Sequence, residues 1–279
     1  MGRNVILEEC VSQVKEILGS DIENITVERT VLGLFFTGVK LSDGNGGLCF
    51  TPIKEIPEAV CCPSSAAAMP LSGKLAGKPV TAYLEYAFSD NALKKAMGIA
   101  ALNALTESCR KRGAFSDYEI TVNRDAFDDV TVTSWEKAVV IGALVPMIRK
   151  LLDAEADFRI LEMDSATLKP REMPYYLHGS RFMEVVPDSD LLVITGVTML
   201  NDTLPDILAA AKPGARILVT GPTASMAPDP FFDHGVTMIG GITVTHPDEL
   251  LDIISEGGSG YHFFGKYAER TVIRRKTQV

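Results

Sequence analysis

The chain lacks a hydrophobic run that could cross a membrane, because no apolar stretch approaches the roughly 20 residues that a bilayer requires. A secretory leader is not expected either. Acidic Glu8, Glu9 and Glu16 and basic Lys15 interrupt the apolar positions near the amino end, which is the pattern of an amphipathic helix. An N-myristoylation signal is missing as well, since Ile6 stands where serine or threonine is required. We therefore expect a cytoplasmic protein without a membrane partner.

An excess of basic residues is also absent. Lysine and arginine number 27 against 36 aspartate and glutamate, which gives a formal charge of −9. Nucleic acids and anionic membranes favour a basic surface, so neither is expected as a partner. Small molecules, cations and other proteins stay open. The five cysteines are odd in number and scattered, which favours free thiols over a disulfide framework.

Several catalytic motifs are missing. The sequence has no P-loop, no G-x-S-x-G elbow and no H-E-x-x-H pair among its four histidines, and no metal site is predicted from ligand spacing. The segment 138–146 (AVVIGALVP) reads like the first strand of a nucleotide-binding domain. However, Gly142 is not followed by the other glycines of G-x-G-x-x-G, so no backbone grip on a pyrophosphate is expected.

Regular patterns divide the chain into two parts. The first begins with a helix at about 4–18, followed by strands at about 24–41 and 47–51 around the glycine-rich turn 42–47. A long helix follows at about 90–112, apolar nearly all round in its middle and ending on basic residues before Gly113. We predict a small α+β domain over residues 1–130.

The second part, residues 131–279, alternates short apolar strands with helical segments. The strands are expected at about 138–142, 158–162, 190–195, 215–220 and 236–244. This alternation is typical of a parallel sheet covered on both faces, and it predicts a Rossmann-like domain. The fold class is therefore α/β.

Polar and small residues follow several of these strands. Ligands of an open parallel sheet bind outside the carboxyl ends of its strands, so these positions are candidate sites: Gly142, Glu162, Asp164, Thr195, Gly196, Asn201, Thr203, Gly221 and Thr223. Glu162 lies 20 positions after Gly142, where a Rossmann domain places its ribose-binding acid. Structural interpretations stay open for both groups: the acids are solvated strand ends, and one of Asn201, Asp202 and Thr203 caps a helix that begins near residue 203.

Three further features each have both a functional and a structural interpretation. Asn103 is a polar residue within an apolar helix, and it either clamps a neighbouring loop or faces an interdomain cleft. Cys61 and Cys62 are free structural thiols or ligands of a soft metal. His234 flanks the last strand as a surface histidine or as an acid–base group.

Several stretches, in this order, resemble a family known mainly from sequence, the heavy-metal chelation proteins: 43–47 (DGNGG), 49–52 (CFTP), 71–77 (LSGKLAG), 101–105 (ALNAL), 140–142 (VIG) with Pro146, 195–196 with 201–203, and 221–223 (GPT). The resemblance implies a domain similar to the N-terminal domain of enolase, fused to a Rossmann-like domain, with the active site between them. It favours the cleft interpretation of Asn103. The name of the family is compatible with making or handling a chelator, without a metal bound directly by the protein.

The first hypothesis is an enzyme acting on a small polar metabolite in the interdomain cleft, in the synthesis or processing of a metal-chelating compound. Its catalytic candidates are Asp43, Asn103, Glu162, Asp164 and His234, and its ligand-binding candidates are Gly142, Thr195, Gly196, Asn201, Thr203, Gly221 and Thr223. No cofactor is assigned. One alternative is a non-catalytic metal or metal-chelate binder that uses Cys61 and Cys62. Another is a methyltransferase-like enzyme holding adenosylmethionine at Gly142 and Glu162.

Overall fold

The amino-terminal helix α1 (Val5–Leu18) begins at Asn4, whose side chain accepts a hydrogen bond from the Leu7 N–H at 3.1 Å. This cap and the buried apolar face of the helix confirm the predicted amphipathic segment. The computed structural model describes residues 4–55, 71–133 and 135–276. Within these ranges no helix is long and apolar enough to cross a membrane.

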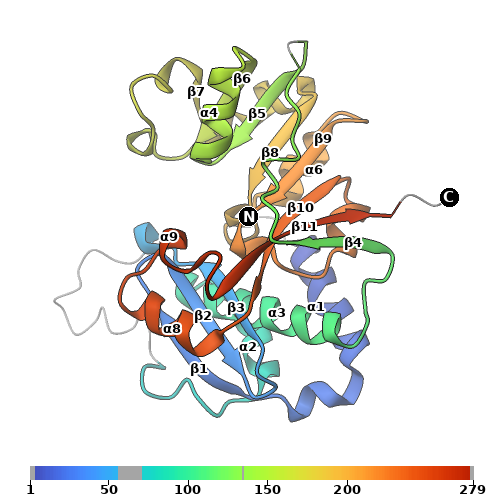
Figure 1. Cartoon of the computed structure of the whole chain (residues 1–279), viewed down its shortest axis with the longest axis vertical. Helices are drawn as coiled ribbons and strands as arrows, with labels where there is room; N and C mark the ends of the chain where they lie inside the picture. The colour runs from blue at the N-terminus through green and yellow to red at the C-terminus, as the bar shows by residue number, and fades with distance from the viewer. Residues whose placement is uncertain (1–3, 56–70, 134, 277–279) are drawn as a thin grey trace.

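The N-terminal unit is a three-stranded antiparallel sheet between two layers of helices. The sheet has the order β1-β2-β3, with β1 Val27–Leu32, β2 Phe36–Leu41 and β3 Gly46–Phe50. One face is covered by α3 (Ala92–Lys111), against which α1 and α2 (Val80–Tyr86) pack. The other face is covered by the C-terminal α8 (Pro247–Ser255), next to which lies α9 (Gly260–Phe263). The chain therefore returns at its end to complete the first unit (Figure 1).

Helix α3 is the central helix of the molecule. Its residues from Lys95 to Cys109 are all buried, as its apolar middle predicted. Strand β3 approaches it so closely that a Cβ on Gly47 would lie 2.2 Å from the carbonyl oxygen of Ala100. Only glycine fits that contact, so Gly47 sets the distance between helix and sheet.

The second unit is built on an eight-stranded sheet with the order β4-β11-β10-β9-β8-β5-β6-β7. The strands from β10 to β7 in that order run parallel, whereas β11 and β4 are antiparallel additions at one edge. Their bounds are β4 Tyr118–Val122, β5 Lys137–Ile141, β6 Asp157–Glu162, β7 Tyr176–His178, β8 Leu191–Thr195, β9 Arg216–Thr220, β10 Met238–Val244 and β11 Ala268–Arg275. The predicted α/β class, with a small α+β unit before a Rossmann-like sheet, is confirmed.

Short helices connect these strands: α4 Val145–Asp153, α5 Val197–Leu200, α6 Leu204–Ala210 and α7 Asp229–Asp233. The five strands expected from the sequence are β5, β6, β8, β9 and β10, each within two residues of its predicted ends. Strand β4 was not expected from the sequence, and its pairing with β11 means that the chain enters the second sheet before residue 130.

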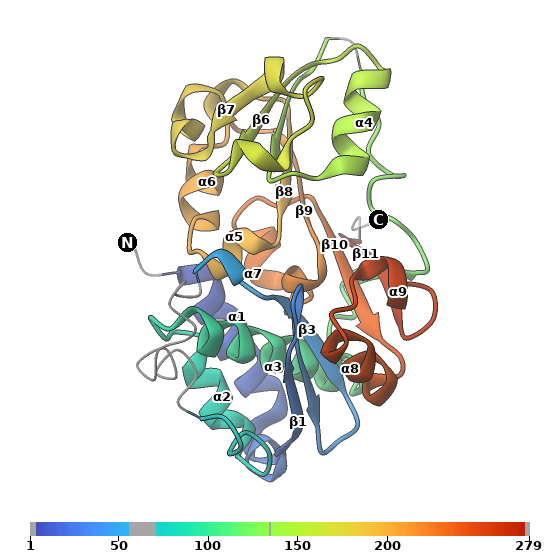
Figure 2. The ribbon, with the colours of Figure 1, turned by 90° about the vertical axis from the view of Figure 1, so that its left-hand side faces the viewer.

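The two units share one hydrophobic core. The largest cluster of buried residues contains Leu7 of α1 and Leu105 of α3 together with Ile141 and Ile194 of the parallel strands. In Figure 2 the parallel strands stand above the N-terminal unit, with α5 and α7 at the junction. The loops that follow the carboxyl ends of β8 and β9 therefore face the N-terminal unit.

Candidate functional site between the two units

The chain order of the large sheet reverses between β5 and β8, where an open α/β sheet binds its ligand. Gly142 follows β5 with φ of 95°, and a Cβ on it would lie 2.8 Å from Cγ2 of Thr195 at the end of β8. A Cβ on Gly196 would lie 2.9 Å from the Ala224 nitrogen. These glycines let the strand-end loops pack against one another, which is their role in the described structure.

The polar candidates after β8 find partners close by in the chain. Thr195 Oγ1 accepts a hydrogen bond from the Val197 N–H at 3.4 Å. Asn201 Oδ1 accepts from the Thr203 hydroxyl at 2.6 Å and from its N–H at 3.3 Å. Helix α6 begins directly after Thr203, near the predicted start, but the Thr203 side chain makes no capping hydrogen bond. These bonds shape the turn, and contact of these residues with a ligand stays a prediction.

The N-terminal unit holds the same loop from the other side. Asp202, with φ of 59°, accepts hydrogen bonds from Asn4 at 3.0 Å and from Lys95 at 2.5 Å. Asn4 also donates to the Met199 carbonyl at 3.0 Å. Lys95 is buried, so this ion pair is shielded from solvent and ties α3 to the loop after β8.

The two acids at the end of β6, Glu162 and Asp164, also have partners within the protein. Glu162 Oε1 accepts from the N–H groups of Met163 and Asp164, at 2.7 and 3.1 Å. Asp164 accepts from the Ala166 N–H at 2.9 Å and forms an ion pair with Lys54 of the N-terminal unit. The hydrogen bond from Lys54 is the main reason that the pKa of Asp164 is lowered. Both acids lie at the predicted sheet edge, with local roles in the described structure.

Asp43 and His234 lie apart from the other candidates. Asp43 is exposed and accepts hydrogen bonds from Asn45 Nδ2 at 2.9 Å and from the Ser108 hydroxyl at 2.5 Å, which fasten the turn between β2 and β3 to α3. His234, at the end of α7, contacts Glu9 of α1, with 2.9 Å between Nε2 and Oε2. Neither residue lines the cavity described below.

Asn103 clamps α3 onto both units. Its Nδ2 donates to the carbonyl oxygens of Leu48 at 2.7 Å, Pro222 at 3.1 Å and Thr223 at 3.2 Å. Thr223 Oγ1 in turn accepts from the Phe50 N–H at 3.0 Å. Three carbonyls around one nitrogen fix the orientation of the amide, because an oxygen there would face only other acceptors.

The oxygen of the same amide is left without a partner. Asn103 is 4% exposed, and its Oδ1 is buried and makes no hydrogen bond with any of the described residues. An unsatisfied buried acceptor costs roughly 1–3 kcal/mol. This oxygen therefore calls for a donor, either an ordered water or a group of a ligand.

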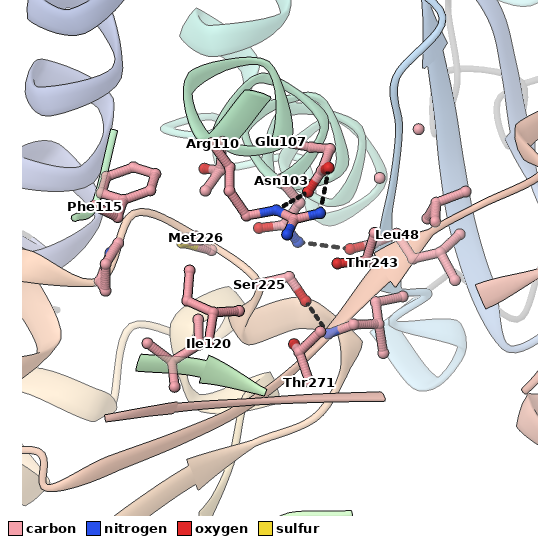
Figure 3. A pocket seen from close by; sticks show the side chains of 17 residues that line it. Leu48, Asn103, Glu107, Arg110, Phe115, Ile120, Ser225, Met226, Thr243 and Thr271 are labelled. Carbon is pink, nitrogen blue, oxygen red and sulfur yellow. Dashed lines mark hydrogen bonds and ion pairs between the residues drawn. The ribbon is translucent and has the colours of Figure 1, made fainter. Parts of the chain in front are cut away.

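A cavity adjoins Asn103, which we call the α3 cavity (Figure 3). Its volume is about 40 Å³, room for a few water molecules. It lies between α3 and the C-terminal part of the large sheet, and its polar lining residues are Asn103, Thr106, Glu107, Arg110, Ser225, Thr243 and Thr271. It is thus an interunit cavity beside the carboxyl end of β10, away from the reversal between β5 and β8 that the rule for parallel sheets selects.

An ion pair lines the cavity on the α3 side (Figure 3). Arg110 donates to Glu107 through two nitrogens, with Nε–Oε2 at 2.8 Å and a terminal nitrogen 2.6 Å from Oε1. Glu107 is 9% exposed. The hydrogen bond with Glu107 is the main reason that the pKa of Arg110 is raised. Across the cavity, Ser225 Oγ accepts from the Ile242 N–H at 2.9 Å.

Glu107 and Arg110 were not among the residues predicted from the sequence. Arg110 reads there as part of the basic last turn of the helix, which it also is. The signal that identifies them is their spacing: Asn103, Glu107 and Arg110 are four and three positions apart, so they share one face of α3. Ser225 and Thr271 give no comparable signal, because only the folded sheet brings them opposite that face.

Fold and cavity define an α/β protein in which a small α+β unit closes over the carboxyl edge of a Rossmann-like sheet. The chain belongs to the family described as "Putative heavy-metal chelation": one profile of that description matches residues 125–273, and a second of the same description matches residues 15–106. The resemblance noted from the sequence is thereby confirmed.

One curated protein and two solved structures are similar to this chain. An uncharacterized protein of Methanocaldococcus jannaschii is 27% identical over 202 residues, covering 70% of this chain and 72% of its own length. A protein of unknown function from Pyrococcus horikoshii has a TM-score of 0.75 at 18% identity, over 96% of this chain and 99% of its own. One from Desulfitobacterium hafniense has a TM-score of 0.68 at 20% identity, over 95% and 100%. At these identities the two solved structures establish the fold.

Among the described residues, no group of three or more His, Cys, Asp and Glu side chains is arranged to hold a metal ion. Cys61 and Cys62 lie outside the described residues. Cys10, Cys49 and Cys109 are buried free thiols. Burial raises the pKa of the Cys49 thiol to about 12, so it is a poor nucleophile and a poor metal ligand at neutral pH.

Proposed function

We propose that the protein binds a small polar metabolite in the α3 cavity and acts in the synthesis or processing of a metal-chelating compound. The observation that supports this most is the buried Oδ1 of Asn103, which has no protein partner among the described residues and adjoins the cavity. A donor of the ligand satisfies this oxygen and recovers its desolvation cost.

The position of the cavity supports the same proposal. It lies outside the carboxyl end of a parallel strand and between two units, where α/β proteins bind small molecules. At about 40 Å³ it holds only a few waters. A metabolite larger than this volume fits only if α3 separates from the loops after β9 and β10.

The heavy-metal description of the family is best read as handling of a chelator. The sparse arrangement of metal ligands in the described residues favours this indirect sense. The non-catalytic metal binder rests on Cys61 and Cys62. Elemental analysis of the purified, reduced protein separates the two: stoichiometric metal that is lost in a Cys61→Ser/Cys62→Ser variant supports the metal binder.

Mass spectrometry of small molecules released from the purified protein tests the proposal. We expect a molecule in stoichiometric amount with the natural chain, retained in Asn201→Ala and lost in Asn103→Leu, with both variants checked for folding by their melting temperatures. Asn201 is the matched control because it belongs to the rival site at the strand-order reversal. Loss in Asn201→Ala with retention in Asn103→Leu places the ligand at that reversal and contradicts the proposal.

A further inference from the structure

The α3 cavity presents opposite charges and a neutral acceptor from a single helix face. Glu107 and Arg110 neutralise each other through two hydrogen bonds, and Asn103 contributes an unpaired oxygen beside them (Figure 3). A ligand that enters the cavity meets this pair directly. Whether the ion pair between Glu107 and Arg110 stays intact or breaks depends on the charges of the ligand.

The side chains of Arg110 and Glu107 are 32% and 10% exposed. Opening such a partly buried ion pair costs free energy unless both charges find new partners. A simple anion pairs with Arg110 and leaves Glu107, which is only 9% exposed, without a counter-charge. A simple cation pairs with Glu107 and leaves Arg110 unpaired. A zwitterion gives both Glu107 and Arg110 a new counter-charge at once, so the net charge of the cavity stays at zero.

We propose that the ligand of the α3 cavity is a zwitterionic amino-carboxylate. Its ammonium group donates to Glu107 and to Asn103 Oδ1, and its carboxylate accepts the two N–H groups of Arg110 that Glu107 releases. The guanidinium fork matches a carboxylate through two parallel hydrogen bonds, so one carboxylate replaces the other without loss of geometry. This inference rests on the proposed function, because it names the ligand class of that same cavity.

The overall charge of the protein agrees with this choice. With 36 acidic and 27 basic residues, the chain repels a simple anion as it approaches. A zwitterion has no net charge and carries no such penalty. The fully buried polar atom of the cavity lining that lacks a partner among the described residues is Asn103 Oδ1, an acceptor, which an ammonium fills and a carboxylate does not.

Calorimetric titration with matched probes tests the ligand class. The probes are the zwitterions glycine and β-alanine, the cation glycinamide and the anion N-acetylglycine. We expect at least one zwitterion to bind about tenfold more tightly than either singly charged analogue, a difference of about 1.4 kcal/mol. Equal or tighter binding of glycinamide or N-acetylglycine, or no binding of either zwitterion, overturns the inference.

Two variants separate the ammonium from the carboxylate contact. In Arg110→Gln the carboxylate partner is gone, so zwitterion and glycinamide should bind equally. In Glu107→Gln the ammonium partner is gone, so zwitterion and N-acetylglycine should bind equally. A zwitterion preference that survives both changes shows that the pair does not recognise the ligand, and it also overturns the inference.

Failure of this inference is distinguishable from failure of the proposed function. Chemical tagging of amines and carboxylates in the co-purified molecule shows whether it carries both groups. A molecule that is lost in Asn103→Leu but lacks one of the groups leaves the proposed function standing and refutes the ligand class. If no molecule co-purifies and no probe binds, both fall.

Discussion

Replacing Asn103 by leucine removes two groups with opposite effects on stability: the Nδ2 donor, which stabilises the fold, and the unpaired Oδ1, which destabilises it. The Nδ2 group serves three buried carbonyls, at 2.7, 3.1 and 3.2 Å. Its two hydrogens satisfy two of them at a time, so their loss costs about 2–6 kcal/mol at roughly 1–3 kcal/mol for each unsatisfied acceptor. The same change removes the unpaired Oδ1, which returns about 1–3 kcal/mol. We expect a net loss of about 2 kcal/mol in the free energy of unfolding.

Thermal unfolding measures this loss. For a chain of this size, about 2 kcal/mol corresponds to a melting temperature lower by roughly 4–8 °C. Thr106→Val is the matched control, since its hydroxyl donates only to the Leu102 carbonyl of the same helix, at 3.0 Å, and a change below about 1 kcal/mol is expected. If Asn103→Leu is as stable as the natural chain, the three carbonyls do not depend on the amide and the clamp is refuted.

Two further predictions concern the surroundings of this clamp. In Gly47→Ala the new methyl lies 2.2 Å from the Ala100 carbonyl oxygen, so α3 and β3 must separate and the free energy of unfolding should fall by about 1–3 kcal/mol or more; a neutral effect in chemical denaturation would show that this contact is loose. The pKa of the Cys49 thiol is about 12 when folded and near the ordinary 9.0 when unfolded. The unfolded chain therefore loses this proton first, and stability falls as pH rises from about 9 towards 12, by about 1.4 kcal/mol for each unit. A Cys49→Ala variant should show a correspondingly shallower loss between pH 9 and 11, and an unchanged slope would exclude Cys49 as a cause.

The sequence was sufficient for elements whose pattern is local. The amphipathic α1, the buried α3 and the apolar strands β5, β6, β8, β9 and β10 all follow from periodicity and flanking glycines. It was insufficient for the C-terminal α8, which covers the sheet of the first unit about 200 residues earlier in the chain, as its contact with β2 shows. From the sequence, the apolar face of α8 is equally compatible with packing on the sheet of the second unit. Periodicity shows that a helix face is buried, but it does not show which element covers that face.

The same limit explains why only part of the candidate site could be predicted from the sequence. Asn103 was recognisable because a polar residue in an apolar helix must find partners, but those partners lie 55, 119 and 120 positions away. His234 appeared to flank the sheet edge, yet its partner Glu9 is 225 positions away on α1. A pattern of residue types thus identifies a side chain that needs a partner, while only the packing of distant loops supplies that partner.

The location of the α3 cavity shows how side chains modify a topological rule. The rule selects the reversal between β5 and β8, yet there Thr195 packs within 2.8 Å of the Cβ position of Gly142, and Asn201 and Thr203 satisfy each other. At the end of β10 the same sheet edge faces α3, whose polar face carries one amide oxygen that its neighbours leave unpaired. On the proposed function, the missing phosphate-binding glycines after Gly142 and the unpaired oxygen of Asn103 belong to one arrangement, in which the helix of the preceding unit, and not the strand-end loop, recognises the ligand.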